Sequence, residues 1–400
     1  MRKTRVAGVI FAGLIVMACG PRAVQTAQTS NAASPTRSQL SGATASPTPT
    51  QDGITALVVC AGGPGPKMRV VAGALVYEVT DPLHPRLVCR SANTALHLLD
   101  GNAIAYTAVI DGHVVIVRRD LTTGAESRVA QLRVEPQPYY YGGGGWTWDG
   151  ALEVYATAGA PRADGRSLVS VHLWSSGADH VLFTIDAGPG GLEGRWSPRG
   201  IVAFSPDRTY LAISDFPFAI YGQNVRVFTV ADQLQKFVTA MSSFGGTWVD
   251  NDSFIWAAAA GSAAASLMQW TPGGGAKLLR SEIWWAPASS PDGRWAAGTL
   301  VSDWANPRVV IAPVGGGAAL TTGSGSSPIF VSPTVVWYAE EGPDTSGNYQ
   351  CLEPCSHPTV PDGNVRAFDV VNGTDRVVSF RAGEAPKTPE GYTSCCFTNG

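Results

Sequence analysis

One phrase is written twice in this chain, and it constrains the fold more than any other feature. FSPDRTYLAIS (204–214) and SSPDGRWAAGT (289–299) both read Ser-Pro-Asp, a turn residue, and then alternating small and large apolar residues. WVDNDSFIWAA (248–258) and FVSPTVVWYAE (330–340) fit the same frame, so the aligned positions 205, 249, 290 and 332 lie 44, 41 and 42 residues apart. This period predicts stacked units that cannot bury their apolar surface alone.

Two further segments, WDGALEVYATA and LDGNAIAYTAV, match the phrase more loosely. Seven other segments read as a strand, a short polar turn and a strand, because apolar and polar residues alternate and the turn holds Gly, Asp or Pro. These segments are ALVYEVTDPLHPRLVC, HVVIVRRDLTTGAESRVAQL, LVSVHLWSSGADHVLFTI, VRVFTVADQLQKFV, SLMQWTPGGGAKLL, RVVIAPVGGGAAL and VRAFDVVNGTDRVVSF. One such pair, added to one pair led by the Ser-Pro-Asp turn, gives the four antiparallel strands of a β-propeller blade.

We therefore predict an all-β chain, a β-propeller with seven four-stranded blades, and six blades as the alternative count. The high Gly and Pro content, 46 and 28 residues, and the low charged fraction of 15% suit a turn-rich β protein. A β-sandwich would not need so regular a repeat. The first blade, within 56–91, shows one obvious upstream strand, ITALVVC, and residues 381–400 are free to complete the closure.

The turn phrase resembles the Ser-Pro-Asp-Gly repeats of TolB-like, WD40-like propellers. Residues 290–293 match this motif in full, residues 205–208 end in Arg instead of Gly, and residues 197–200 carry Arg in place of Asp. The resemblance spans about 95–380. It implies a fold and carries no activity with it.

The first twenty residues, MRKTRVAGVIFAGLIVMACG, predict an exported chain. A basic start precedes an apolar run over 6–18, which is too short for a membrane span and suits a signal-peptide core. Val16-Met17-Ala18-Cys19 resembles the bacterial lipobox, which implies cleavage before Cys19, acylation of Cys19 and a lipid anchor on the extracytoplasmic face of the cell membrane. An ordinary secretory signal with a coincidental cysteine is the alternative.

Residues 20–55 hold no aromatic residue and are rich in Ser, Thr, Ala, Pro and Gln, so we predict a disordered tether. The predicted organisation is a lipoprotein signal peptide over 1–18, a lipidated cysteine and linker over 19–55, and a propeller over 56–400.

Six cysteines follow Cys19, and an even count in an exported protein predicts disulfides. Proximity favours a Cys60–Cys89 bridge within the first blade. Zinc binding through the segment around His357 and the cysteine pair near the end is the alternative. The remaining four disulfide candidates are Cys351, Cys355, Cys395 and Cys396.

No hydrolase elbow, Walker loop or dinucleotide fingerprint occurs, so we predict a chain that is not an enzyme and takes no cofactor. The net charge of −3 without a basic stripe argues against nucleic acid. The six scattered histidines are interpreted as structural. Glu340, Glu341 and Asp344 form an acidic cluster for which a calcium site and a solvated loop are both open.

The aromatic segment PQPYYYGGGGWTW (136–148) is the best hint of function, because Tyr and Trp offer large contact area with a polar edge. Packing between blades is the alternative for all of these residues. The candidate binding residues are Tyr139, Tyr140, Tyr141, Trp146, Trp148, Trp284 and Trp285.

We predict a membrane-anchored, non-enzymatic binding or scaffold module for a protein, peptide or glycan of the cell envelope. The alternative is a propeller hydrolase that cleaves glycosides or lactones with carboxylates near the propeller axis.

Overall fold

The computed structural model of this chain is all-β: every regular element among the described residues is a strand. Residues 1–57 lie outside the described residues, so the signal peptide, the acylated Cys19 and the tether stay predictions. No helix in the described part is long and apolar enough to cross a membrane. The structure describes residues 58–60, 69–72, 75–91, 96–99, 102–132, 145–148, 151–158, 162–164, 166–189, 202–214, 224–239, 242–259, 265–282, 284–300, 307–343 and 359–386.

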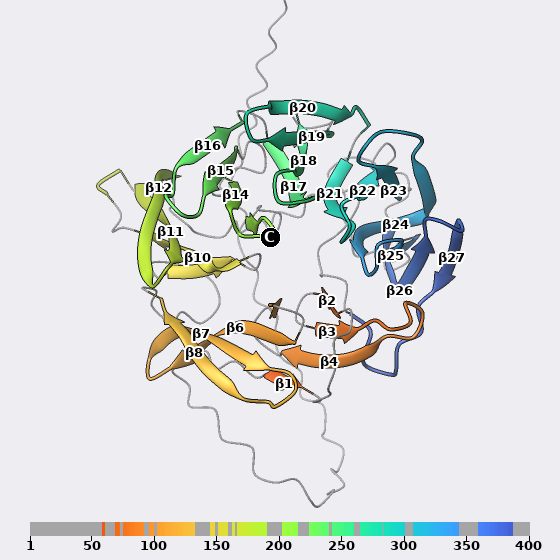
Figure 1. Ribbon diagram of the computed structural model, residues 1–400, viewed down its shortest axis with the longest axis horizontal. Coiled ribbons are helices and arrows are strands. Elements are labelled where there is room, and N and C mark those ends of the chain that lie inside the picture. Colours follow the sequence, from red (N-terminus) through yellow and green to blue (C-terminus); the bar gives the residue numbers. More distant parts are fainter. Residues whose placement is uncertain are drawn as a thin grey trace, which may run out of the picture. The chain divides into compact units, whose positions relative to one another are not determined.

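The strands pair antiparallel, and outside the first sheet each pairs with its neighbours in the chain; we name the resulting sheets A to G (Figure 1). Sheets A, B, C and D hold β1 (Val58–Cys60), β2 (Arg69–Ala72), β3 (Leu75–Glu78), β4 (Arg86–Ser91); β5 (His97–Leu98), β6 (Ala103–Ile110), β7 (His113–Asp120), β8 (Glu126–Gln131); β9 (Gly145–Trp148), β10 (Ala151–Ala158), β11 (Arg166–Ser175), β12 (Ala178–Pro189); and β13 (Val202–Phe204), β14 (Tyr210–Ser214), β15 (Val225–Thr229), β16 (Gln235–Val238).

Sheets E, F and G complete the described strands. They hold β17 (Ser242–Trp248), β18 (Phe254–Ala259), β19 (Ala265–Thr271), β20 (Gly275–Arg280); β21 (Trp284–Ser289), β22 (Trp295–Leu300), β23 (Arg308–Pro313), β24 (Leu320–Phe330); and, sharing β24, β25 (Val335–Pro343), β26 (Thr359–Asp369), β27 (Thr374–Val377).

The long strand β24 joins sheets F and G into one seven-stranded sheet. Its first half pairs with β23, up to the partners Arg308 and Ser324, and its second half pairs with β25 from Gly325 onward. A count of seven blades requires that the two halves of β24 belong to separate blades. The number of blades therefore stays a prediction.

The Ser-Pro-Asp phrase forms the turn between the first and second strands of a sheet, as predicted. In sheet F the Ser290 hydroxyl donates to Asp292 at 2.6 Å and accepts from the backbone N–H of Trp295 at 3.0 Å. Ser205 makes the corresponding bonds in sheet D, to Asp207 at 2.7 Å and from Tyr210 at 3.0 Å. Both serines are buried, so their side chains satisfy turn groups that water does not reach.

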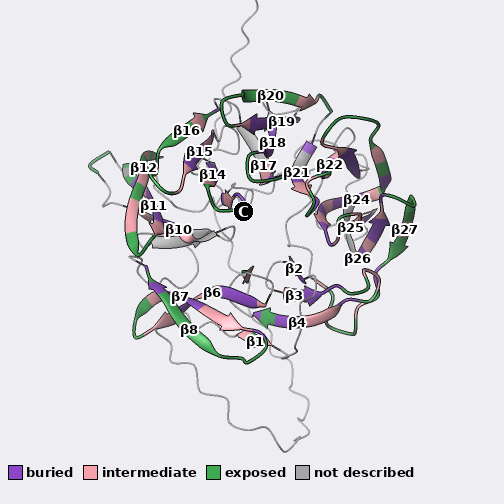
Figure 2. Ribbon diagram, viewed as in Figure 1, coloured by how far each residue is buried: buried purple, intermediate pink, exposed green. Residues whose placement is uncertain are grey.

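Each sheet packs on the next through apolar side chains that alternate along its inner strands. The D–E contact gathers Val225, Trp248, Phe254 and Trp256, and a cluster of the same kind joins each other consecutive pair of sheets. Burying one such Trp removes roughly 150–250 Å² from water, about 4–6 kcal/mol at about 25 cal/mol per Å². Figure 2 shows the result: buried residues lie on inner strands, and exposed residues on the outer strands β8, β16, β20 and β27.

The last sheet packs on the first. The indole Nε1 of Trp337 in sheet G donates to the Pro82 carbonyl at 3.0 Å, and the Ser379 N–H donates to the Leu83 carbonyl at 2.8 Å. Trp337 and Tyr77 of sheet A also share an apolar cluster, with ring centroids 5.9 Å apart. A closed succession of antiparallel sheets, most of them four-stranded in the described part of the chain, is a β-propeller, so the predicted fold class is confirmed.

The strand order of sheet A corrects the expected closure. ITALVVC contains β1, which is the outermost strand, and the unpredicted strand β2 (RVVA) is the innermost one, in the order β1-β4-β3-β2. All four strands therefore come from residues 58–91. Within the described residues the C-terminal segment 378–386 contacts this sheet through single hydrogen bonds and apolar packing, and adds no strand to it.

Candidate functional site

Three sheets in the described part of the chain contain the same cross-strand clamp, which joins a buried tyrosine, a carboxylate and a basic side chain. In sheet G the Tyr338 hydroxyl on β25 donates to Asp375 on β27 at 2.6 Å, and Arg366 on β26 donates to the same carboxylate at 2.9 Å. Burial, reinforced by the Asp375 hydrogen bond, raises the pKa of Tyr338 above its usual range. The same arrangement recurs as Tyr106–Glu126–Arg119 in sheet B and Tyr155–Asp179–His172 in sheet C.

The clamp of sheet C contains a histidine between a carboxylate and a hydroxyl group, as a catalytic relay does. His172 Nδ1 lies 3.1 Å from an Asp179 oxygen, and His172 Nε2 lies 2.8 Å from the Thr157 hydroxyl. However, Tyr155 covers the imidazole in a stacked contact at 4.8 Å, and Tyr155 and His172 are both buried. Because the same pairing holds strands together in sheets B and G, we interpret this cluster as structural.

Two glutamates of the predicted acidic cluster have partners within the protein. Glu340 accepts from Arg366 at 2.8 Å and from Asn364 at 3.0 Å, and Glu341 is buried and accepts from the Ser326 hydroxyl. These contacts replace the expected solvated loop for both glutamates, whereas Asp344 lies outside the described residues. No three His, Cys, Asp or Glu side chains gather at metal-binding distance within the described ranges.

The described histidines occupy different sheets and do not converge. His84 lies in sheet A, His97 and His113 in sheet B, and His172 and His180 in sheet C. Burial lowers the pKa of His97 to about 4.

The predicted aromatic residues have mixed outcomes. Trp284 is 1% exposed in the cluster between sheets E and F, so it packs there and does not form an exposed binding surface, which corrects the prediction for this residue. Trp146 and Trp148 lie on β9 and Trp285 on β21, and the structure describes only their backbone. Tyr139, Tyr140 and Tyr141 lie outside the described residues.

One disulfide links the outermost strand of sheet A to its neighbour. Cys60 of β1 and Cys89 of β4 are directly paired in the strand register and are bonded to each other. The other candidates, Cys351, Cys355, Cys395 and Cys396, and also His357, lie outside the described residues.

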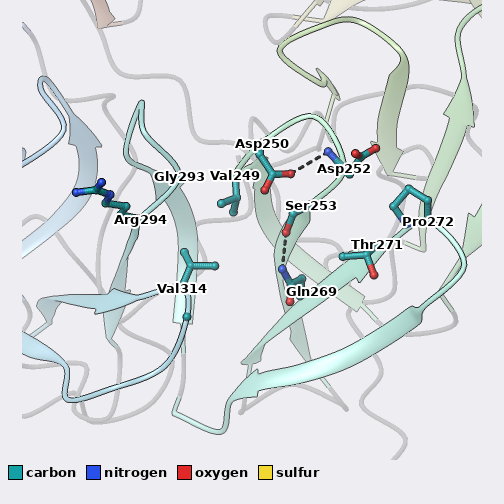
Figure 3. Close-up of a pocket in the computed structure, with 11 residues that line it drawn as sticks. Val249, Asp250, Asp252, Ser253, Gln269, Thr271, Pro272, Gly293, Arg294 and Val314 are labelled. Atoms are coloured by element: carbon teal, nitrogen blue, oxygen red, sulfur yellow. Dashed lines mark hydrogen bonds between the residues drawn. The ribbon is translucent and has the colours of Figure 1, made fainter.

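A depression of about 680 Å³ between sheets E and F was not predicted, and it is the candidate functional site (Figure 3). Four tight turns surround it: β17–β18 and β19–β20 of sheet E, and β21–β22 and β23–β24 of sheet F. The Ser-Pro-Asp-Gly turn of sheet F supplies Gly293 to this lining. Its backbone has φ +70°, and an added Cβ would lie 2.7 Å from the Val249 carbonyl oxygen. Glycine therefore lets the two sheets approach closely beside the depression.

The interior of the depression is polar. Gln269 and Ser253 are 9% and 5% exposed, and the Gln269 carboxamide N–H donates to the Ser253 hydroxyl. Asp250 and Asp252 stand above them on the β17–β18 turn (Figure 3), and the Asp252 N–H donates to an Asp250 oxygen at 2.8 Å. The pair Ser253–Gln269 thus presents hydrogen-bonding groups from below, and two carboxylates present negative charge from one side.

The basic side chain of the lining points elsewhere. Arg294 extends away from Asp250 and Gln269 in Figure 3, and its Nε lies 3.6 Å from an Asp292 oxygen. Val249, Pro272 and Val314 supply apolar surface at the edge of the same depression. The site can therefore hold a ligand that donates hydrogen bonds and carries an apolar portion.

Comparison with known proteins supports no assignment beyond the fold. No family model matches the chain, and no curated protein does. TolB from Acinetobacter baumannii is 16% identical, with 76% of this chain and 75% of that chain covered and a TM-score of 0.37. The β-propeller domain of the Trilobed protease from Pyrococcus furiosus is 12% identical, with 70% and 82% covered and a TM-score of 0.40.

The tricorn protease is 7% identical, with 81% of this chain but 36% of that chain covered, at a TM-score of 0.45. Similarities at this level identify no function. The sheet topology itself defines the class of protein, a β-propeller with a polar depression between two of its sheets.

Proposed function

We propose that this chain is a membrane-anchored, extracytoplasmic β-propeller that binds a protein, peptide or glycan of the cell envelope without catalysing a reaction. The single observation that supports binding is the depression between sheets E and F. Its carboxylates and its buried amide–hydroxyl pair face an open space of about 680 Å³, a volume typical of ligand sites. The titratable groups of the cross-strand clamps, in contrast, are paired with one another inside single sheets.

The proposed anchor rests on the sequence, because Val16-Met17-Ala18-Cys19 resembles a lipobox and a polar segment follows it. Acyl chains on one cysteine would hold the chain to the bilayer, since each buried methylene contributes about 0.8 kcal/mol. The substitution Cys19→Ala should move the protein from the membrane pellet to the soluble fraction. An unchanged distribution would remove the anchor from the proposal.

Affinity capture tests the binding role. The full chain, solubilised in mild detergent, is immobilised and exposed to an envelope extract, and bound proteins and glycans are eluted with salt and identified by mass spectrometry. The double variant Asp250→Asn/Asp252→Asn serves as the comparison, and Glu282→Gln as the control. Glu282 is exposed and lies on the β20–β21 connection, at the opposite strand ends of the same two sheets. Capture that is the same for all three proteins would contradict a binding role for the depression.

A further inference from the structure

We infer that the depression between sheets E and F recognises a basic side chain, that of lysine or arginine, presented by a peptide or protein. This inference rests on the proposed function and specifies the chemistry of its ligand. Three properties of the depression carry it: the sign of the charge on its wall, the hydrogen-bonding character of its interior, and the apolar surface at its edge.

The wall of the depression carries two negative charges that no ion pair among the described residues neutralises. Asp250 and Asp252 are exposed, and neither carboxylate forms an ion pair with a described Lys, Arg or His. Arg294 is directed to Asp292 at 3.6 Å, on the sheet F side. Lys277 pairs with Gln269 in the strand register but does not line the depression. Two neighbouring carboxylates attract a cation and repel an anionic ligand.

The interior offers an acceptor. Gln269 is nine-tenths buried, its Nε2 is committed to the Ser253 hydroxyl, and no described residue donates to its Oε1. The Gln269 carbonyl oxygen can therefore accept a hydrogen bond from a ligand in the depression, and ammonium and guanidinium groups carry only donors. The acceptor and the two carboxylates therefore select a cationic head group.

The edge of the depression is apolar and can pack against the methylene chain of a lysine or arginine. Val249, Val314 and Pro272 border the depression, on three of its four turns. Lysine and arginine bury their methylene chains along apolar surface while the charged head reaches polar partners. A neutral glycan would match the hydrogen-bonding groups but would leave the two carboxylates without a counter-charge.

Ligand-observed NMR titration of the full chain in detergent tests this inference with two synthetic probes. Acetyl-Gly-Gly-Lys-Gly-Gly-amide carries the basic side chain, and the matched norleucine peptide has the same stem without the charge. We expect binding of the lysine peptide, at least tenfold weaker binding of the norleucine peptide, and salt sensitivity. The substitution Asp250→Asn/Asp252→Asn should weaken lysine-peptide binding about tenfold, since tenfold corresponds to about 1.4 kcal/mol, whereas Glu282→Gln should leave it unchanged.

Equal binding of the two peptides, or equal binding by the double variant and the parent, would overturn the inference. Binding of a neutral oligosaccharide in place of the lysine peptide would also overturn it and would assign the depression to glycans. If neither peptide binds but affinity capture still recovers an envelope partner through the depression, the basic-side-chain inference fails and the proposed function stands. If capture fails as well, both fail. The asparagine variants keep side-chain size at exposed turn positions, and an unchanged melting temperature verifies their folding.

Discussion

Replacing Gly293 with alanine should destabilise the propeller by about 2–5 kcal/mol, for two separable reasons. The backbone of Gly293 has φ +70°, and this left-handed conformation costs an L-residue roughly 1–2 kcal/mol. In addition, the new Cβ would lie 2.7 Å from the Val249 carbonyl oxygen. Sheets E and F must then separate slightly, and such overpacking costs roughly 1–3 kcal/mol.

Gly112→Ala is the matched control, because it isolates the first reason. Gly112 has φ +76° in the β6–β7 turn, and an added Cβ would meet nothing within 4 Å. We expect this variant to lose only the backbone part, about 1–2 kcal/mol. Urea unfolding followed by tryptophan fluorescence gives the free energy of unfolding for both variants. A loss at Gly293 no larger than the loss at Gly112 would refute the close approach of the two sheets.

Arg208 occupies the position of Gly293 in the sheet D turn, also at positive φ, +60°. There the arginine gains compensating contacts, since its guanidinium lies 2.9 Å from Glu153 and 4.0 Å from the Phe204 ring centroid. The two copies of the turn thus differ because their neighbouring sheets differ.

Three further predictions concern other parts of the fold. Burial lowers the pKa of His97 to about 4, so the unfolded chain takes up a proton first as the pH falls below about 6.5. The free energy of unfolding should therefore decline between about pH 6.5 and 4 by up to about 3 kcal/mol. In melting experiments at a series of pH values, His97→Gln should flatten that decline. Reducing the Cys60–Cys89 disulfide, or replacing both cysteines with serine, should lower the free energy of unfolding by about 2–4 kcal/mol, measured as a lower urea midpoint. In the serine variant, dithiothreitol should not change the stability of sheet A. Trp337→Phe removes the 3.0 Å bond to the Pro82 carbonyl and should cost about 1–3 kcal/mol; an unchanged unfolding midpoint would contradict closure through sheets G and A.

The sequence was sufficient to predict the strand pairs, because their signals are local. The Ser-Pro-Asp turns, the alternation of apolar residues and the Gly- or Asp-containing hairpins all act within about ten residues. Each of the seven predicted hairpin segments overlaps two consecutive strands in the structure, from β3–β4 to β26–β27. The pairing of Cys60 with Cys89 also followed from proximity alone.

Features that depend on contacts between sheets were not predictable from one sequence. The outer position of β1 is decided by its pairing with β4, which no local pattern encodes. Trp284 was predicted as a candidate binding residue because it is aromatic, yet packing between sheets E and F buries it. The depression needs side chains from turns about 65 residues apart, from Val249 to Val314, and only the folded chain brings them together.

Site-specific photo-crosslinking tests most directly whether partners bind at the depression. Benzophenone replaces the Pro272 side chain, which is exposed and lines the depression, or the Val371 side chain, which is 70% exposed on the β26–β27 turn of sheet G. Both proteins are irradiated with an envelope extract and with the lysine peptide. We predict cross-links from position 272 that excess lysine peptide suppresses, and none from position 371. Equal cross-linking from both positions, or cross-linking from position 371 alone, would contradict the account.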